Sequence, residues 1–201
     1  MQDFKELLEM GLKFHGHKCP AMPLGLRAGL AALEALGVQR AADGQLTALV
    51  ETDRNHCSAC FVDGVQVATG STAGKGNLKS LGYGKFALTL IDNKTGRSVR
   101  VAATREAIRR NQESELNRLR KQGIPASQVE AILVDPLIEV VLAESVDVLF
   151  KIEPIQRVTL PPMQPTAFDA VICAECGEVT VERYARVKRG QIVCIPCAEK
   201  A

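Results

Sequence analysis

The sequence predicts an α+β fold that is followed by a small zinc-binding module. Apolar residues recur at helical spacing over the first 36 positions, whereas later segments alternate and include a hairpin signal. Helices followed by an antiparallel element and further helices are typical of α+β proteins. Towards the C-terminal end, two CxxC pairs are separated by 17 residues, which is the spacing of a four-cysteine zinc site.

The first half of the chain is expected to contain three helices, one short strand and a glycine-rich loop. Gly37 is a stop signal after the second helix, and Asp63 lies in the first turn of the third. The expected elements are helices over residues 3–14, from near Pro20 to Leu36 and over 60–69, a strand over 46–51, and a loop over 70–80.

The second half is expected to begin with a hairpin and to end in a strand. Its alternating segments flank the turn residues 93–96. Thr104 can cap the charged helix that follows, and Glu106 and Arg110 are spaced for an ion pair, so we interpret this helix as a solvated surface. The expected elements are strands over residues 86–92 and 97–103, helices over 104–121 and 127–133, and a strand over 146–155.

The predicted domain organisation has three parts. A first domain covers residues 1–157, a linker covers 158–169, and a four-cysteine finger covers 170–201. Three prolines within residues 159–166 make the linker stiff and extended.

Composition favours an ordinary globular protein with metal chemistry. The net charge of +2 and the absence of Trp give no general argument for a nucleic-acid or membrane partner. The charged N-terminus lacks the apolar region of a signal peptide, so a cytoplasmic location is expected. Seven cysteines in such a chain indicate metal or redox chemistry rather than a disulfide framework.

A His-x-His-x-Cys motif precedes the second helix. Cys19 is expected beside a helix N-terminus, where backbone N–H groups favour a thiolate. His15 and His17 would point the same way in an extended segment. Imidazole and thiolate suit zinc and similar ions, so the motif predicts a metal site. The alternative interpretation is a helix cap with two partly exposed histidines.

The segment His15–Pro20 resembles the signature of the FmdE family, which is named for one of the subunits of molybdenum formylmethanofuran dehydrogenase. Two departures concern ligands: Ser71 replaces a cysteine that is common in the family, and the insertion-like residues 55–59 add His56 and Cys57. Ala21 replaces a glycine. The resemblance continues through residues 50–52, 60–66, 69–78 and 83–87.

The resemblance implies a helix–strand–helix–three-strand core with a mixed sheet, and a homodimer. It also implies that Cys60 binds a metal together with His17 and Cys19. Three protein ligands would leave an open, catalytic position, whereas His56 or Cys57 would close the site. In another interpretation Cys57 and Cys60 are a redox pair or inert thiols. We expect His15 to support the site from outside the ligand set.

The C-terminal cysteines are expected to bind one structural zinc ion. The segment is too small to fold without a bound metal ion, so metal binding and folding should be one event. A redox role for either pair is the alternative. This segment resembles the zinc finger of the DksA/TraR family, and its basic residues could contact nucleic acid or polymerase, although a solvated surface is the simpler interpretation. The ligands are Cys173, Cys176, Cys194 and Cys197, and the basic residues are Arg183, Arg186, Lys188 and Arg189.

The glycine-rich segment that ends in Lys75 does not match a phosphate-binding P-loop. Three residues rather than four separate Gly70 from Gly74, and Gly76 follows the lysine. Lys75 therefore stays a candidate pocket residue only. Asp63 and Gln66, one helical turn apart, are candidates for supporting or capping roles.

Three functions follow from these interpretations. The first is an accessory or metal-handling subunit of molybdenum or tungsten formylmethanofuran dehydrogenase-type chemistry, which the FmdE resemblance implies. The second is a stand-alone metalloenzyme in which an ion bound by His and Cys activates a substrate. The third is a metal-sensing regulator that acts through the finger. The sequence shows no complete acid–base set, so catalysis is left open.

Overall fold

A computed structural model describes residues 4–52, 59–159 and 167–200. The chain divides into two compact units, residues 1–160 and 161–201, and each is a separate body. Among the described residues, no helix combines the length and the apolar character that crossing a bilayer requires.

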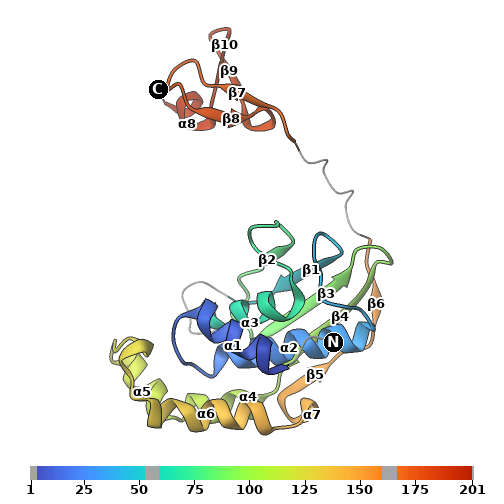
Figure 1. Cartoon of the computed structure of the whole chain (residues 1–201), viewed down its shortest axis with the longest axis vertical. Coiled ribbons are helices and arrows are strands. Elements are labelled where there is room, and N and C mark those ends of the chain that lie inside the picture. The colour runs from blue at the N-terminus through green and yellow to red at the C-terminus, as the bar shows by residue number, and fades with distance from the viewer. Residues whose placement is uncertain (1–3, 53–58, 160–166, 201) are drawn as a thin grey trace. The chain divides into compact units, whose positions relative to one another are not determined.

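The first unit contains helices and one sheet (Figure 1). Its helices are α1 (Phe4–His15), α2 (Ala21–Leu36), α3 (Ala59–Thr69), α4 (Arg105–Gln112), α5 (Glu115–Lys121), α6 (Ala131–Ala143) and α7 (Val146–Leu149), with a 3-10 turn at Ala126–Gln128. Its strands are β1 (Leu46–Val50), β2 (Leu78–Ser80), β3 (Ala87–Asp92), β4 (Arg97–Ala103), β5 (Phe150–Ile152) and β6 (Gln156–Arg157).

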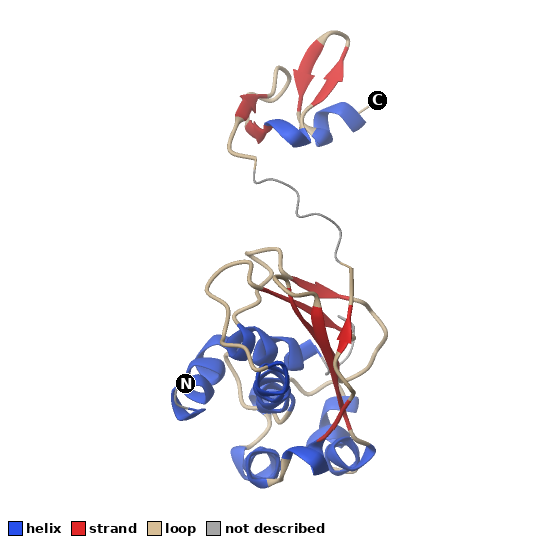
Figure 2. Cartoon of the chain, turned by 90° about the vertical axis from the view of Figure 1, so that its right-hand side faces the viewer, coloured by secondary structure: helices blue, strands red, loops and turns tan. Residues whose placement is uncertain are grey.

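The sheet is mixed and has the strand order β2-β1-β3-β4-β5, with β6 also pairing with β4. β1 and β2 are parallel, whereas the other pairs are antiparallel. Figure 2 shows helices packed against one face of this sheet. The predicted α+β class with a mixed sheet is therefore confirmed.

The core lies between the sheet and helices α2 and α3. Alternate residues of β1, β3 and β4 point towards these helices and are buried because their partners across the layer are apolar. Phe61 and Val65 on α3 are both fully buried there. The sheet residues of this core are Leu46, Ala48, Val50, Leu88, Leu90, Val99 and Val101.

Helices α2 and α3 cross at backbone contact distance. A Cβ atom at Gly64 would lie 2.0 Å from the carbonyl oxygen of Met22, and one at Gly25 would lie 1.9 Å from that of Phe61. Only glycine fits at such an approach. Since Cys19 lies just before α2 and Cys60 lies in the first turn of α3, the crossing fixes where these two cysteines meet.

Most expected elements of the first half are confirmed. Helix α2 ends at Leu36, and Gly37 adopts the left-handed conformation with φ of 65°. The expected loop over 70–80 is wrong at its end, because Leu78–Ser80 forms β2 and pairs in parallel with β1. A three-residue strand has too short a pattern to stand out, and its partner supplies the register.

The expected helix over residues 104–121 is two helices. Thr104 caps α4 by accepting a hydrogen bond from the Ala107 N–H at 3.1 Å, as predicted. Ser114 interrupts the helix and caps α5 by accepting from the Asn117 N–H at 3.1 Å. The predicted pair of Glu106 and Arg110 is present at 3.6 Å.

The expected helix over residues 127–133 is wrong, because α6 continues through Pro136 to Ala143. Pro136 is the sixth residue of α6, where it removes its own backbone hydrogen bond and its ring crowds the carbonyl of Ile132. Val134, Ile138 and Val141 form a buried stripe that stabilises the longer helix. Arg27 of α2 also binds the Val141 carbonyl at 2.6 Å, near the α6 C-terminus.

The expected strand over residues 146–155 is also wrong in part, because its first half is the single turn α7. Thr104 explains the turn: its backbone N–H donates to the Leu149 carbonyl at 2.9 Å and its hydroxyl donates to the Val148 carbonyl at 2.7 Å. Tertiary hydrogen bonds here outweigh the strand preference of the valines.

The C-terminal unit consists of two hairpins and a short helix. Its elements are β7 (Ala170–Ile172), β8 (Val179–Val181), β9 (Arg186–Lys188), β10 (Gln191–Val193) and α8 (Ile195–Glu199), with a 3-10 turn at Glu182–Tyr184. Its core contains three buried cysteines and Val193, with Ala198 packed against them. This core is very small, and many apolar side chains of the unit are exposed.

Candidate metal centres

The first cluster forms where three chain segments meet. Helix α1 ends at His15, Gly16 turns the chain with φ of 83°, and α2 begins two residues after Cys19. Cys60 enters from the first turn of α3. One ligand atom from each of His15, His17, Cys19 and Cys60 lies within 4.8 Å of the others. This group could hold a metal ion.

The spacing of the ligand atoms suits a tetrahedral ion. The His15 Nε2 atom lies 3.2 Å from the His17 Nε2 atom and 3.3 Å from the Cys19 Sγ atom. Two nitrogens at about 2.1 Å from a tetrahedral ion are separated by about 3.4 Å, and a nitrogen and a sulfur by about 3.6 Å. Imidazole and thiolate donors also match zinc and related transition metals.

The structure brings the three predicted ligands His17, Cys19 and Cys60 together and adds His15. The sequence interpretation placed His15 outside the ligand set, whereas its Nε2 atom points at the other ligand atoms. The signal for this was its spacing, because His15 stands two residues before His17 and four before Cys19. His56 and Cys57 lie outside the described residues.

Asp63 holds His15 from the outside of the cluster. Its Oδ2 atom accepts from the His15 Nδ1 atom at 2.7 Å, and its Oδ1 atom accepts from the Gln66 Nε2 atom at 3.2 Å. A carboxylate on the far nitrogen fixes the tautomer and increases the basicity of a ligating imidazole. Asp63 and Gln66 thus occupy supporting positions around the ligand group.

The groups of the cluster shift one another's pKa values through shared hydrogen bonds. Hydrogen bonds to Asp63 and then to Cys60 raise the pKa of His15 to about 9, against the effect of burial. The pKa of Cys19 is lowered because Cys60 donates a hydrogen bond to it, and backbone N–H groups of α2 assist. The pKa of Cys60 is raised, first because of Cys19 and then because of burial. A bound metal ion would displace the protons that these groups share.

Helix α6 anchors the motif. Lys18, between the two predicted ligands His17 and Cys19, donates to both carboxylate oxygens of Asp135, at 2.8 and 3.0 Å. Both side chains are partly exposed, so this ion pair adds little to the free energy of folding. Its effect is to hold the segment with His17 and Cys19 against α6.

Ser71 and Lys75 have structural contacts. Ser71 is buried, and its hydroxyl donates to the Leu46 carbonyl at 3.4 Å. The Lys75 ammonium donates to the Ala42 carbonyl at 2.9 Å, and Lys75 does not line the cavity beside the cluster. The candidate pocket role of Lys75 gains no support from this arrangement.

The second cluster contains the four C-terminal cysteines, with all their sulfur atoms within 4.8 Å of one another. The Sγ atoms of Cys176 and Cys194 are 3.8 Å apart. Two sulfurs at about 2.3 Å from one tetrahedral ion are separated by about 3.8 Å, which is the same spacing. Backbone N–H groups of Cys176 and Cys194 lower the pKa of Cys173 to about 6, so this sulfur ionises readily. The six cysteines that the structure describes are all free thiols.

The fold and the clusters define a class of protein: an α+β protein with one His/Cys cluster and one four-cysteine cluster, each able to hold a metal ion. Within this class the chain belongs to the FmdE family. The family model described as "FmdE, Molybdenum formylmethanofuran dehydrogenase operon" matches residues 14–151.

Two known proteins are similar to this chain. The crystal structure of a protein from Syntrophus aciditrophicus, described as similar to the FmdE component of tungsten formylmethanofuran dehydrogenase, has the same fold. The TM-score is 0.61 at 24% identity, and the match covers 97% of this chain and 91% of that chain. A protein of Archaeoglobus fulgidus named "Probable S-adenosyl-L-methionine-binding protein" is 34% identical over 96% of this chain. The chain spans about half, 52%, of that relative's length.

Proposed function

We propose that this FmdE-family protein binds a transition metal ion through His15, His17, Cys19 and Cys60. The observation that carries the proposal is the convergence of these four ligand atoms within 4.8 Å, from three separate segments. The carboxylate of Asp63 supports the proposal, because a metal-binding histidine almost always donates its second ring N–H to a carboxylate, a backbone carbonyl or water.

We further propose that Cys173, Cys176, Cys194 and Cys197 bind a structural zinc ion. Four thiolates at tetrahedral spacing form a closed zinc site, and the unit has almost no other core. In this proposal residues 158–169 connect a domain of residues 1–157 to a zinc finger of residues 170–201. The finger then serves as a docking module.

The role that fits best is that of an accessory or metal-handling subunit for molybdenum or tungsten oxidoreductase chemistry of the formylmethanofuran dehydrogenase type. The family description names the formylmethanofuran dehydrogenase operon, and the Syntrophus structure is described as similar to a subunit of the tungsten enzyme. A cytoplasmic homodimer that contacts oxidoreductase subunits is part of this proposal.

A stand-alone metalloenzyme is the second candidate, and a cavity of about 190 Å³ beside the cluster favours it. The cavity is smaller than the roughly 300–1,000 Å³ of sites for larger ligands. The convergence of four ligand atoms argues against an enzyme, because four protein ligands fill a tetrahedral ion and leave no open position for a substrate. We therefore place the accessory role first.

Co-purification tests the accessory role. Full-length protein with an affinity tag is expressed in its native host, isolated under mild conditions, and analysed for molybdenum, tungsten and pterin. We expect one of the two metals and a pterin to co-purify with the tagged chain. Purified protein that carries only its own bound metal, without pterin or partner subunits, would contradict the accessory role.

A further inference from the structure

A cavity of about 190 Å³ opens beside the first cluster. His17, Cys19 and Cys60 line it on the cluster side. The rest of the wall comes from the start of α2, from α4 and α5, and from the 3-10 turn after α5. These remaining lining residues are Pro20, Ala21, Asn111, Leu116, Asn117, Arg120, Ala126 and Ser127.

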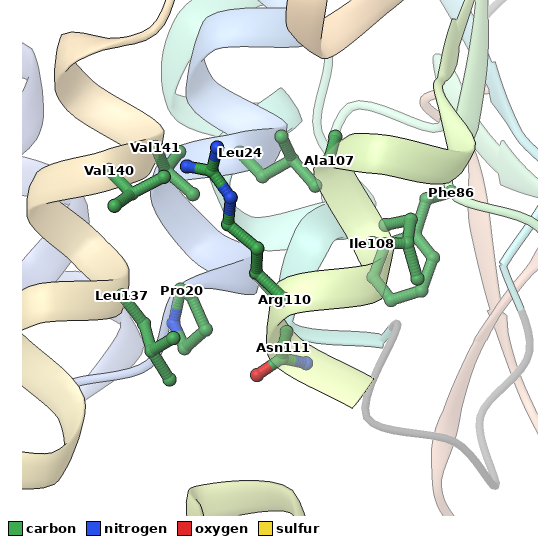
Figure 3. A pocket seen from close by; sticks show the side chains of 11 residues that line it. Pro20, Leu24, Phe86, Ala107, Ile108, Arg110, Asn111, Leu137, Val140 and Val141 are labelled. Carbon is green, nitrogen blue, oxygen red and sulfur yellow. The ribbon is translucent and has the colours of Figure 1, made fainter. Parts of the chain in front are cut away.

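Asn111 gives this wall a buried acceptor without a partner. Its side-chain oxygen Oδ1 is buried and has no hydrogen-bond partner among the described residues. An unpaired buried amide is costly, and such groups call for a partner such as a ligand. Asn111 also lines a second, smaller cavity of about 30 Å³ between α2, α4 and α6, where it projects from α4 at the edge (Figure 3).

Arg120 gives the cavity a positive charge. It is the one Lys or Arg among the lining residues that the structure describes, and it is exposed. One guanidinium nitrogen, Nη1, donates to the Ile124 carbonyl at 2.7 Å and so fixes the side chain. Within the described part of the chain, Arg120 has no carboxylate partner, unlike Arg109 on α4 and Arg118 on α5. Its remaining donors are available to an anion.

We propose that this cavity binds a small carboxylate that carries a hydroxyl or amino group. The carboxylate pairs with Arg120, whose planar fork fits two oxygens. In this proposal the Asn111 side chain rotates to present its buried Oδ1 atom to the cavity, where the hydroxyl or amino group of the ligand donates to it. Pro20, Ala21 and Leu116 contact the short apolar body. The ligand would lie against the proposed metal cluster, so this inference deepens the proposed function and rests on it.

The size of the cavity limits the ligand. The volume of about 190 Å³ is below the roughly 300–1,000 Å³ of sites for larger ligands. Lactate and alanine are small enough, whereas a nucleoside-sized ligand is not. The cavity therefore selects short acids, and an uncharged analogue of the same shape should bind poorly.

Binding of lactate and alanine to metal-loaded, full-length protein tests the proposal by isothermal titration calorimetry. Propionate lacks the hydroxyl of lactate and lactamide lacks the negative charge, so both are matched controls. We expect lactate, alanine or both to bind saturably, and each analogue to bind about tenfold more weakly or worse than lactate if lactate is the ligand. No saturable binding of either acid overturns the proposal.

Single substitutions test whether Arg120 and Asn111 contact the bound acid. Arg120→Gln should weaken binding of the acid about tenfold or more, whereas Arg118→Gln, on the same helix but outside the cavity, should not change it. Asn111→Leu should remove the preference for lactate over propionate. Equal affinity of wild type and Arg120→Gln overturns the proposal. If Arg120→Gln does not fold, Arg120→Lys and the comparison of lactate with lactamide on wild type decide the same point.

Metal content of the same samples separates the two claims. Wild type that holds its first-domain metal but binds neither acid overturns this inference alone. Wild type that holds no metal in the first domain contradicts the proposed function, whatever its affinity for lactate or alanine.

Discussion

Replacing Cys194 by serine is expected to unfold the C-terminal unit while residues 4–159 remain folded. Three buried cysteines, Val193 and the packed Ala198 are almost all the core that this unit has. Metal binding would therefore supply its folding free energy, and structural zinc in small fingers contributes about 10–16 kcal/mol at neutral pH. A chelator should have the same effect as the substitution.

Two-dimensional NMR of the backbone amides measures this result residue by residue. Signals from residues 167–200 should collapse to the narrow range of an unfolded chain in Cys194→Ser, whereas those of the first unit stay dispersed. Cys19→Ser, which alters the other cluster, is the matched control and should leave the signals of the C-terminal unit unchanged. Dispersed signals of this unit in metal-free Cys194→Ser would show that its fold does not depend on the ion.

Gly64→Ala should strongly destabilise the first unit. The added Cβ would lie 2.0 Å from the Met22 carbonyl oxygen and 2.3 Å from the Leu26 nitrogen. Both atoms belong to the backbone of α2, so no side-chain rotation can relieve the overlap and the helices must move apart. We expect a loss of about 3 kcal/mol or more in the free energy of unfolding, at the upper end for overpacked cores.

Urea unfolding followed by circular dichroism measures this loss. Gly74→Ala is the matched control, because a Cβ there meets nothing within 4 Å. Since the two helices carry Cys19 and Cys60 into the first cluster, Gly64→Ala should also weaken metal binding in the first unit. Equal unfolding free energies for Gly64→Ala and Gly74→Ala would refute the close crossing of α2 and α3.

The sequence predicts those parts of the fold that depend on the backbone preferences of a few neighbouring residues. The stop at Gly37, the cap at Thr104 and the hairpin over residues 86–103 rest on backbone preferences that a short window contains. The continuation of α6 through Pro136 rests on partners elsewhere in the chain, namely Arg27 and the buried stripe. Tertiary contacts of this kind leave no trace in a local pattern.

The candidate sites also divide into features that the local sequence indicates and features that depend on distant contacts. The CxxC pairs indicate their four cysteines by spacing alone. For the first cluster the His-x-His-x-Cys motif indicates His17 and Cys19, whereas Cys60 is implied by the FmdE resemblance and His15 is expected outside the ligand set. The sequence does not predict the cavity, because its charged segment over residues 104–121 indicates a solvated surface. Ser114 breaks that segment into two helices, and Leu116 is then buried beside Asn111 and Arg120. The serine cap within the charged run was the available signal.

Metal content per chain tests the central claim most directly. Elemental analysis is made of untagged, full-length wild type and of a Cys19→Ser/Cys60→Ser variant, with circular dichroism to show that both are folded. One ion for each of the two clusters predicts two equivalents in wild type and one in the variant. One equivalent in both proteins would contradict the account, because the first cluster would then hold no metal.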